Sequence, residues 1–93
     1  MISCEGERCI VQGPITIANA TAVLAESADR FTTPVVIVDL SGVTEVDSAA
    51  VSLLLEWRRV AARANRHIQF VDLPQNLKTL ADLYGVSHLI APA

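Results

Sequence analysis

The residues of this sequence that could take part in chemistry are concentrated between Asp39 and Val51. Asp39 follows a run of β-branched residues, and Asp47 and Ser48 come directly before an apolar segment. We therefore expect Asp39 to lie at the carboxyl end of the central strand, where ligand and regulatory loops of α/β sheets gather. Asp47 can cap a helix, whose unpaired N–H groups favour a phosphate or carboxylate. Two interpretations stay open: Asp47 only caps the helix, or Asp47 and Ser48 form a binding or regulatory site.

Other groups that could support catalysis are isolated in the sequence. His67 and His88 have no neighbouring ligand or base, and Cys4 and Cys9 have no second pair to complete a metal site. Neither the phosphate-binding pattern G-x-x-x-x-G-K-[ST] nor the dinucleotide pattern G-x-G-x-x-G occurs. We therefore expect no enzyme activity, no metal and no cofactor. A small phosphotransfer enzyme that uses Asp39 or Asp47 is the alternative from another class.

The elements that must position these residues follow from the periodicity of apolar side chains. The β-branched run 35–38 predicts a central strand buried on both faces, and helical spacing predicts helices over 17–31 and 48–64. The order strand, helix, strand makes strands 35–38 and 68–71 parallel. The fold class is α/β: a mixed four-stranded sheet covered by helices. Its predicted elements are strand 1–4, strand 8–12, helix 17–31 capped by Thr16, strand 35–38, loop 39–47, helix 48–64, strand 68–71, helix 74–84 and a tail from 86 in which Leu89 and Ile90 are candidates to pack back.

The first two strands form a predicted hairpin that brings the two cysteines together. Gly6 at the first central position suits a tight turn, and that register places Cys4 opposite Cys9. A disulfide would close only a very small loop, and a reducing compartment opposes it. We therefore expect two free thiols.

Composition limits the classes of partner. The chain has 93 residues, which is the size of one domain spanning 1–93, and a net charge of −3. This charge argues against nucleic acid and against attraction to an anionic membrane. The most apolar stretch, 49–55, is too short to cross a bilayer, and the first residues lack the features of a signal peptide. We expect a cytoplasmic protein with no direct membrane insertion.

The start of the helix 48–64 is the best candidate for a docking surface. Hydrophobic residues make up 52% of the chain, and the first half of this helix is apolar almost all round. Ala49 and Ala50 are small enough to let another backbone approach, and Val51 and Leu55 add contact area. The sequence leaves open whether this face contacts a partner or a second copy of the chain.

Three segments together resemble the STAS domain family, which includes anti-sigma factor antagonists and the cytoplasmic tails of sulfate transporters. The resemblance covers nearly the whole chain and implies the fold given above. The segments are the β-branched strand followed by Asp39-Leu40-Ser41 and then Val46-Asp47-Ser48, the run Gln12-Gly13-Pro14-Ile15-Thr16, and the run Leu77-Lys78-Thr79-Leu80-Ala81-Asp82-Leu83-Tyr84-Gly85.

Within this family, the helix start separates two groups. In the antagonists it reads Asp-Ser-Ser-Gly and the second Ser is phosphorylated, but here Ala49 stands at that position. The run Asp47-Ser48-Ala49-Ala50 resembles the MlaB-type branch instead. This implies a subunit that binds the ATPase of an ABC transporter, alongside permease and lipid-binding subunits, and supports its assembly and activity. Such a system moves phospholipid between the inner and outer membranes, so the subunit would be peripheral to the inner membrane through its complex. A phosphorylation-regulated antagonist of an anti-sigma factor is the alternative. The predicted partner-binding or regulatory residues are Ser48, Asp47, Ala49, Ala50, Val51, Leu55 and Asp39.

Overall fold

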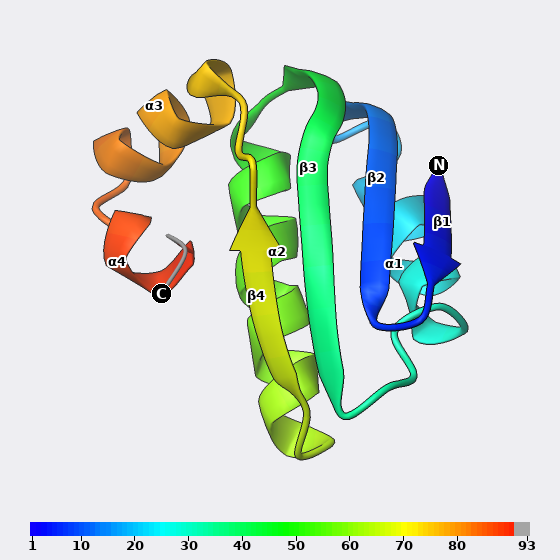
Figure 1. Cartoon of the computed structure of the whole chain (residues 1–93). Helices are drawn as coiled ribbons and strands as arrows, with labels where there is room; N and C mark the ends of the chain where they lie inside the picture. Colours follow the sequence, from blue (N-terminus) through cyan, green and yellow to red (C-terminus); the bar gives the residue numbers. More distant parts are fainter. Residues whose placement is uncertain (91–93) are drawn as a thin grey trace.

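Four strands form one mixed sheet in the computed structural model, which describes residues 1–90 (Figure 1). β1 pairs with β2 in the antiparallel sense, whereas β2 with β3 and β3 with β4 are parallel. The predicted fold class and the parallel pairing of the third and fourth strands are thereby confirmed. The strands are β1 (Ile2–Glu5), β2 (Arg8–Ile15), β3 (Val35–Val46) and β4 (His67–Val71), and they lie in this order across the sheet.

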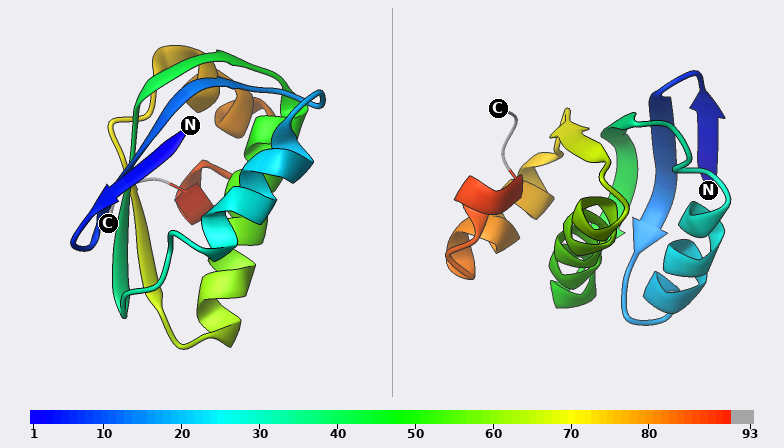
Figure 2. Two further views of the ribbon diagram at one scale, coloured as in Figure 1. Left: turned by 90° about the vertical axis from the view of Figure 1, so that its right-hand side faces the viewer. Right: turned by 90° about the horizontal axis from the view of Figure 1, so that it is seen from below.

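The helices cover one face of this sheet. They are α1 (Ala20–Ala28), α2 (Ser48–Arg63), α3 (Gln75–Leu83) and α4 (Ser87–Ile90). α1 and α2 pack over the strands, and α3 and α4 lie on the same side, next to β4 (Figure 2). Val36 and Val38 point toward the helices and are buried, while Val35 and Ile37 are only half-buried. The prediction that this strand is buried on both faces was wrong, because no helix within residues 1–90 covers the second face.

The core lies between α2 and the sheet, as the apolar stripe of this helix predicted. Trp57 is 2% exposed, and its ring centroid lies 5.1 Å from that of Phe31 and 6.4 Å from that of Phe70. Ile90 is also buried, so α4 packs back onto the domain, whereas Leu89 stays partly exposed. The rest of the predicted tail, residues 91–93, lies outside the described residues. In α2 the buried side chains are Ala50, Val51, Leu53, Leu54, Trp57 and Ala61.

β2 and β3 run further than predicted, and the expected loop 39–47 is mostly strand. β3 continues to Val46 because β2 continues beside it through Gly13 and Pro14 to Ile15. Two register shifts let the longer β3 follow the shorter β2, and the second one skips Pro14, which has no N–H to donate. Strand pairing thus overrides the turn-forming tendency of these residues.

The first helix is shorter than predicted. It begins at Ala20 and ends at Ala28, because residues 16–19 form a turn in which the Thr16 carbonyl accepts the N–H groups of Asn19 and Ala20 at 3.1 and 2.9 Å. Asn19 is the residue at the helix start, not Thr16. Its side-chain oxygen accepts the Thr16 N–H at 2.9 Å, which closes the turn.

The hairpin register was predicted correctly, but the state of its cysteines was not. Gly6 adopts a positive φ of 61°, and Cys4 pairs directly with Cys9. The two sulfur atoms form a disulfide, and the Cα atoms lie 4.0 Å apart. The expectation of free thiols was wrong. It rested on the small loop and the reducing compartment, but the strand register places the two cysteine side chains directly opposite each other on one face of the hairpin.

Candidate functional site

Asp47 fixes the start of α2. Its Oδ1 accepts the Ala49 N–H at 2.9 Å, which is the predicted helix cap. Its Oδ2 accepts the Ile17 N–H at 2.9 Å, which joins the start of α2 to the turn before α1. Both carboxylate oxygens therefore bind backbone N–H groups, and Asp47 sets the position of the residues on either side of it.

Ser48 and Ser52 form a polar ridge on the exposed side of α2. Ser48 is the first residue of the helix and Ser52 follows one turn later, so the two side chains lie on the same face. Both residues are exposed. The Ser48 hydroxyl makes no hydrogen bond within residues 1–90, and it is free to meet another molecule.

A groove lies on each side of this ridge. The first, of about 360 Å³, lies between α2 and α1. On the α1 side it is lined by Ile17, in the turn before α1, and by Thr21 of α1. The second, also about 360 Å³, lies between α2 and the turn after α3 and is lined by Leu55 and Tyr84. Ile17 is 83% exposed and Tyr84 is 52% exposed, so apolar side chains border the ridge on both sides. We define the α2 entry surface as Ile17, Thr21, Ser48, Ser52, Leu55 and Tyr84.

The predicted site residues around α2 occupy different depths below this surface. Ala49 is half-buried and lines the groove toward α1. Leu55 is half-buried and lines the other groove, while Val51 lines the same groove with only 4% of its area exposed. Ala50 is completely buried, so it supports the surface from below. The structure thus brings Asp47, Ser48, Ala49, Val51 and Leu55 together at one end of α2.

Asp39 lies on the other face of the sheet. Its neighbours Val38 and Leu40 point toward the helices, so the alternation along β3 turns Asp39 away from them. The Asp39 carboxylate accepts the Ser41 N–H at 2.9 Å and a guanidinium N–H of Arg8 at 2.8 Å. Asp39 therefore lies apart from the residues at the start of α2. It was predicted at the end of a strand, but it lies within β3.

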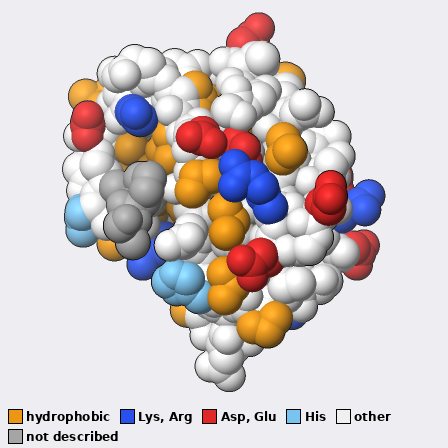
Figure 3. Space-filling model, in the orientation of Figure 1, with side chains coloured by type: hydrophobic (Ala, Val, Ile, Leu, Met, Phe, Trp, Pro, Cys, Tyr) orange, Lys and Arg blue, Asp and Glu red, His pale blue; other side chains and the backbone are white. Residues whose placement is uncertain are grey.

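The environment of Asp39 favours its charged form. Hydrogen bonds from Ser41 lower the pKa of the Asp39 carboxyl, the Arg8 guanidinium lowers it further, and burial opposes both. Arg8 also lies 3.6 Å from a carboxylate oxygen of Asp72. Figure 3 shows this open face of the sheet, where apolar side chains surround adjoining basic and acidic groups. These contacts give Asp39 a role in holding β2 and β3 together.

The α2 entry surface presents apolar side chains and hydroxyl groups. No histidine lines either groove. Asp47, next to Ser48, already accepts two backbone N–H groups, and Glu56, which lines the groove toward α1, is paired with Arg59. Ser48 therefore has no base positioned to activate it. Among residues 1–90 there is no cluster of three or more side chains that could hold a metal ion.

Sequence reasoning missed four residues of the α2 entry surface: Ile17, Thr21, Ser52 and Tyr84. Ile17 was expected inside a helix, and Tyr84 was expected on the apolar face of the last helix, yet both are exposed. Ser52 was not considered, although its spacing of four residues from Ser48 was a readable signal for a shared helix face.

The mixed four-stranded sheet with its helices on one face, and with the start of α2 exposed, defines a small α/β domain. The sequence matches the family described as Mlab, STAS domain, over residues 6–91. The chain belongs to this family, as the motifs around Asp39 and Asp47 indicated.

One relative is the intermembrane phospholipid transport system binding protein MlaB of Haemophilus influenzae, which is 35% identical to the chain over 65 residues. These residues make up 70% of this chain but span only 62% of the relative's own length. Among solved structures, the anti-sigma factor antagonist SpoIIAA in its unphosphorylated form matches 100% of the chain and 86% of its own, with a TM-score of 0.75 and 11% identity. A structure of Mglu matches 81% of the chain with 19% of its own, at 25% identity and a TM-score of 0.61. At 11% identity, the likeness to SpoIIAA shows the fold alone.

Proposed function

We propose that this protein is a non-catalytic subunit of an ABC transport system that moves phospholipid between the inner and outer membranes. In this proposal it binds the ATPase subunit through the α2 entry surface and supports the assembly and activity of a complex that also holds permease and lipid-binding subunits. The chain is then cytoplasmic and peripheral to the inner membrane. The name of the Haemophilus influenzae relative supports the transport system.

The observation that carries the docking role is the exposed apolar rim at the start of α2. Ile17 and Tyr84 expose large apolar side chains on either side of Ser48 and Ser52, and a groove separates each from the ridge. Exposed apolar groups bordering a polar ridge are typical of surfaces that another protein covers. No helix within residues 1–90 is long and apolar enough to cross a bilayer, so in this proposal the chain reaches the membrane through its partners.

The position of Ala49 argues against the alternative, an antagonist of an anti-sigma factor that is switched by phosphorylation. Ala49 has no hydroxyl, and it is half-buried in the groove beside α1. Ser48 is exposed one residue earlier, at the first position of the helix. The fold likeness to SpoIIAA does not distinguish the two functions, because both proposals use the same fold.

The test is affinity purification of the tagged chain from its native cell, with identification of the proteins that remain bound. We expect an ABC ATPase and its permease in stoichiometric amounts. Recovery of a kinase-like anti-sigma factor without any ATPase would refute the transport proposal and establish the alternative.

A further inference from the structure

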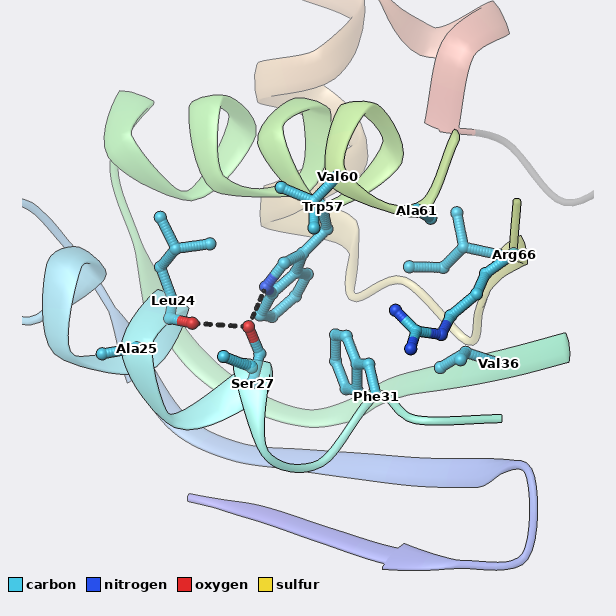
Figure 4. A pocket seen from close by; sticks show the side chains of 11 residues that line it. Leu24, Ala25, Ser27, Phe31, Val36, Trp57, Val60, Ala61 and Arg66 are labelled. Atoms are coloured by element: carbon cyan, nitrogen blue, oxygen red, sulfur yellow. Dashed lines mark hydrogen bonds between the residues drawn. The ribbon is translucent and has the colours of Figure 1, made fainter. Parts of the chain in front are cut away.

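A third groove lies at the opposite end of α2 from the α2 entry surface. It occupies about 400 Å³ between the second halves of α1 and α2 and the first residues of β3 and β4 (Figure 4). We call it the Trp57 groove, since the rings of Trp57 and Phe31 stand along it. Its lining residues are Leu24, Ala25, Ser27, Ala28, Phe31, Val36, Trp57, Val60, Ala61, Arg66 and Ile68.

The polar groups of Ser27 and Trp57 in this lining are already paired with each other. The Trp57 Nε1–H donates to Ser27 Oγ at 2.8 Å, and the Ser27 hydroxyl donates to the Leu24 carbonyl at 2.6 Å (Figure 4). The walls are otherwise apolar, apart from Arg66. A ligand in this groove would therefore meet apolar side chains and one cation.

Arg66 is placed to receive an anion. It is half-buried, and its guanidinium points along the groove toward Phe31 (Figure 4). It forms no ion pair with any residue among 1–90, whereas Arg8 and Arg59 are paired with carboxylates. An arginine is charged at every physiological pH and offers a planar fork of donors that matches a carboxylate.

The charge around the groove favours an anion as well. Five of the seven Lys and Arg residues lie just after α1, in the second half of α2 or just after it: Arg30, Arg58, Arg59, Arg63 and Arg66. The acidic residues in the same segments are Asp29 and Glu56, and Glu56 is paired with Arg59. The ends of α1 and α2 thus carry more basic than acidic residues, while Glu5 and Glu7 at the β1–β2 turn lie at the same end of the sheet, beside the start of β3. The arginines at the helix ends favour an anion near Arg66.

We propose that the Trp57 groove binds a medium-chain fatty carboxylate, with the chain against Trp57 and Phe31 and the head paired with Arg66. The volume of about 400 Å³ lies near the lower end of the range for small-molecule sites, which suits one short acyl chain and not a two-chain phospholipid. This site goes beyond the proposed transport function and does not depend on it. Leu24 is the one lining residue that it shares with the groove between α1 and α2 beside the α2 entry surface.

Trp57 is the single tryptophan of the chain, so its fluorescence reports on this groove alone. We would titrate the full chain with decanoate below its micelle concentration, and separately with decanol. We expect a saturable change with one decanoate per chain and weaker binding of decanol, which lacks the charge.

Arg66→Gln should weaken decanoate binding by about tenfold or more, since a hydrogen bond to a charged group contributes that much. Arg58→Gln removes an exposed arginine of α2 that does not line the groove, and this variant should bind decanoate normally.

A second pair of variants tests the position of the ligand without touching the charge. Ala28→Phe fills the groove from the exposed side of α1, and Ala22→Phe adds the same ring to α1 outside the groove. We expect Ala28→Phe to abolish the fluorescence change and Ala22→Phe to preserve it, with both variants folded by circular dichroism. The proposal is overturned if decanoate gives no saturable change, or if Arg66→Gln binds it as tightly as the unmodified chain does.

Discussion

Replacing Asp47 by Ala removes both hydrogen bonds through which this carboxylate joins α2 to the turn before α1. Loss of the helix cap to the Ala49 N–H costs about 1 kcal/mol of unfolding free energy. Loss of the bond to the Ile17 N–H costs about 1 kcal/mol more. The sum, about 2 kcal/mol, corresponds to a fall in melting temperature on the order of 10 °C for a domain of this size. Asp47→Asn keeps one oxygen acceptor, so it should lose about half as much.

The assay is thermal unfolding followed by circular dichroism, with urea unfolding to obtain the free energy. Glu45→Ala is the control, because it removes an exposed acid from the adjacent strand end and should leave the melt nearly unchanged. If Asp47→Ala melts at the temperature of the unmodified chain, the carboxylate does not hold α2 in place.

Three further predictions concern the core, the open face of the sheet and the hairpin. Ser27→Ala leaves the buried Trp57 N–H without its acceptor and should cost about 1–3 kcal/mol in urea unfolding. The pKa of Asp39 is lowered in the folded state, so its charged form stabilises the fold at neutral pH. This stabilisation is lost as the pH falls below the ordinary aspartate pKa of 3.8 and through the lower folded-state pKa. Asp39→Asn should therefore make the urea midpoint depend less on pH in the acid range. Reduction of the Cys4–Cys9 disulfide should lower stability by at most about 2 kcal/mol, because the closed loop is short, and paired melts with and without reductant measure this.

The order of the elements could be predicted from the sequence because each carries a strong local signal. The β-branched residues 35–38 and the apolar stripe of α2 both reflect burial against the same core, and the parallel pairing follows from their order. The extension of β3 to Val46 could not be predicted. Ser41 and Gly42 favour turns locally, and they are held extended only because β2 continues alongside.

Only part of the candidate site, the start of α2, could be predicted from the sequence. The position of Asp47 and Ser48 at the start of α2 follows from helix capping, which depends on neighbouring residues. The exposure of Ile17 and Tyr84 depends on where the turn before α1 and the end of α3 come to lie, which is a property of the packed domain. Asp39 was grouped with Asp47 because both are acids in one segment, but the strand between them carries Asp39 to the open face of the sheet.

The proposed docking role is tested most directly by the affinity of the purified chain for the ATPase recovered with it. Ser48→Glu places a charge in the centre of the α2 entry surface at a helix N-terminus that tolerates it, so the fold should persist. An unpaired charge in a packed interface costs on the order of 2 kcal/mol, which predicts about thirtyfold weaker binding by calorimetry with an unchanged melt. Ser3→Glu is the matched control, because Ser3 is an exposed serine of β1, away from this surface. Equal affinity of Ser48→Glu and Ser3→Glu would contradict the proposal that the partner binds at the start of α2.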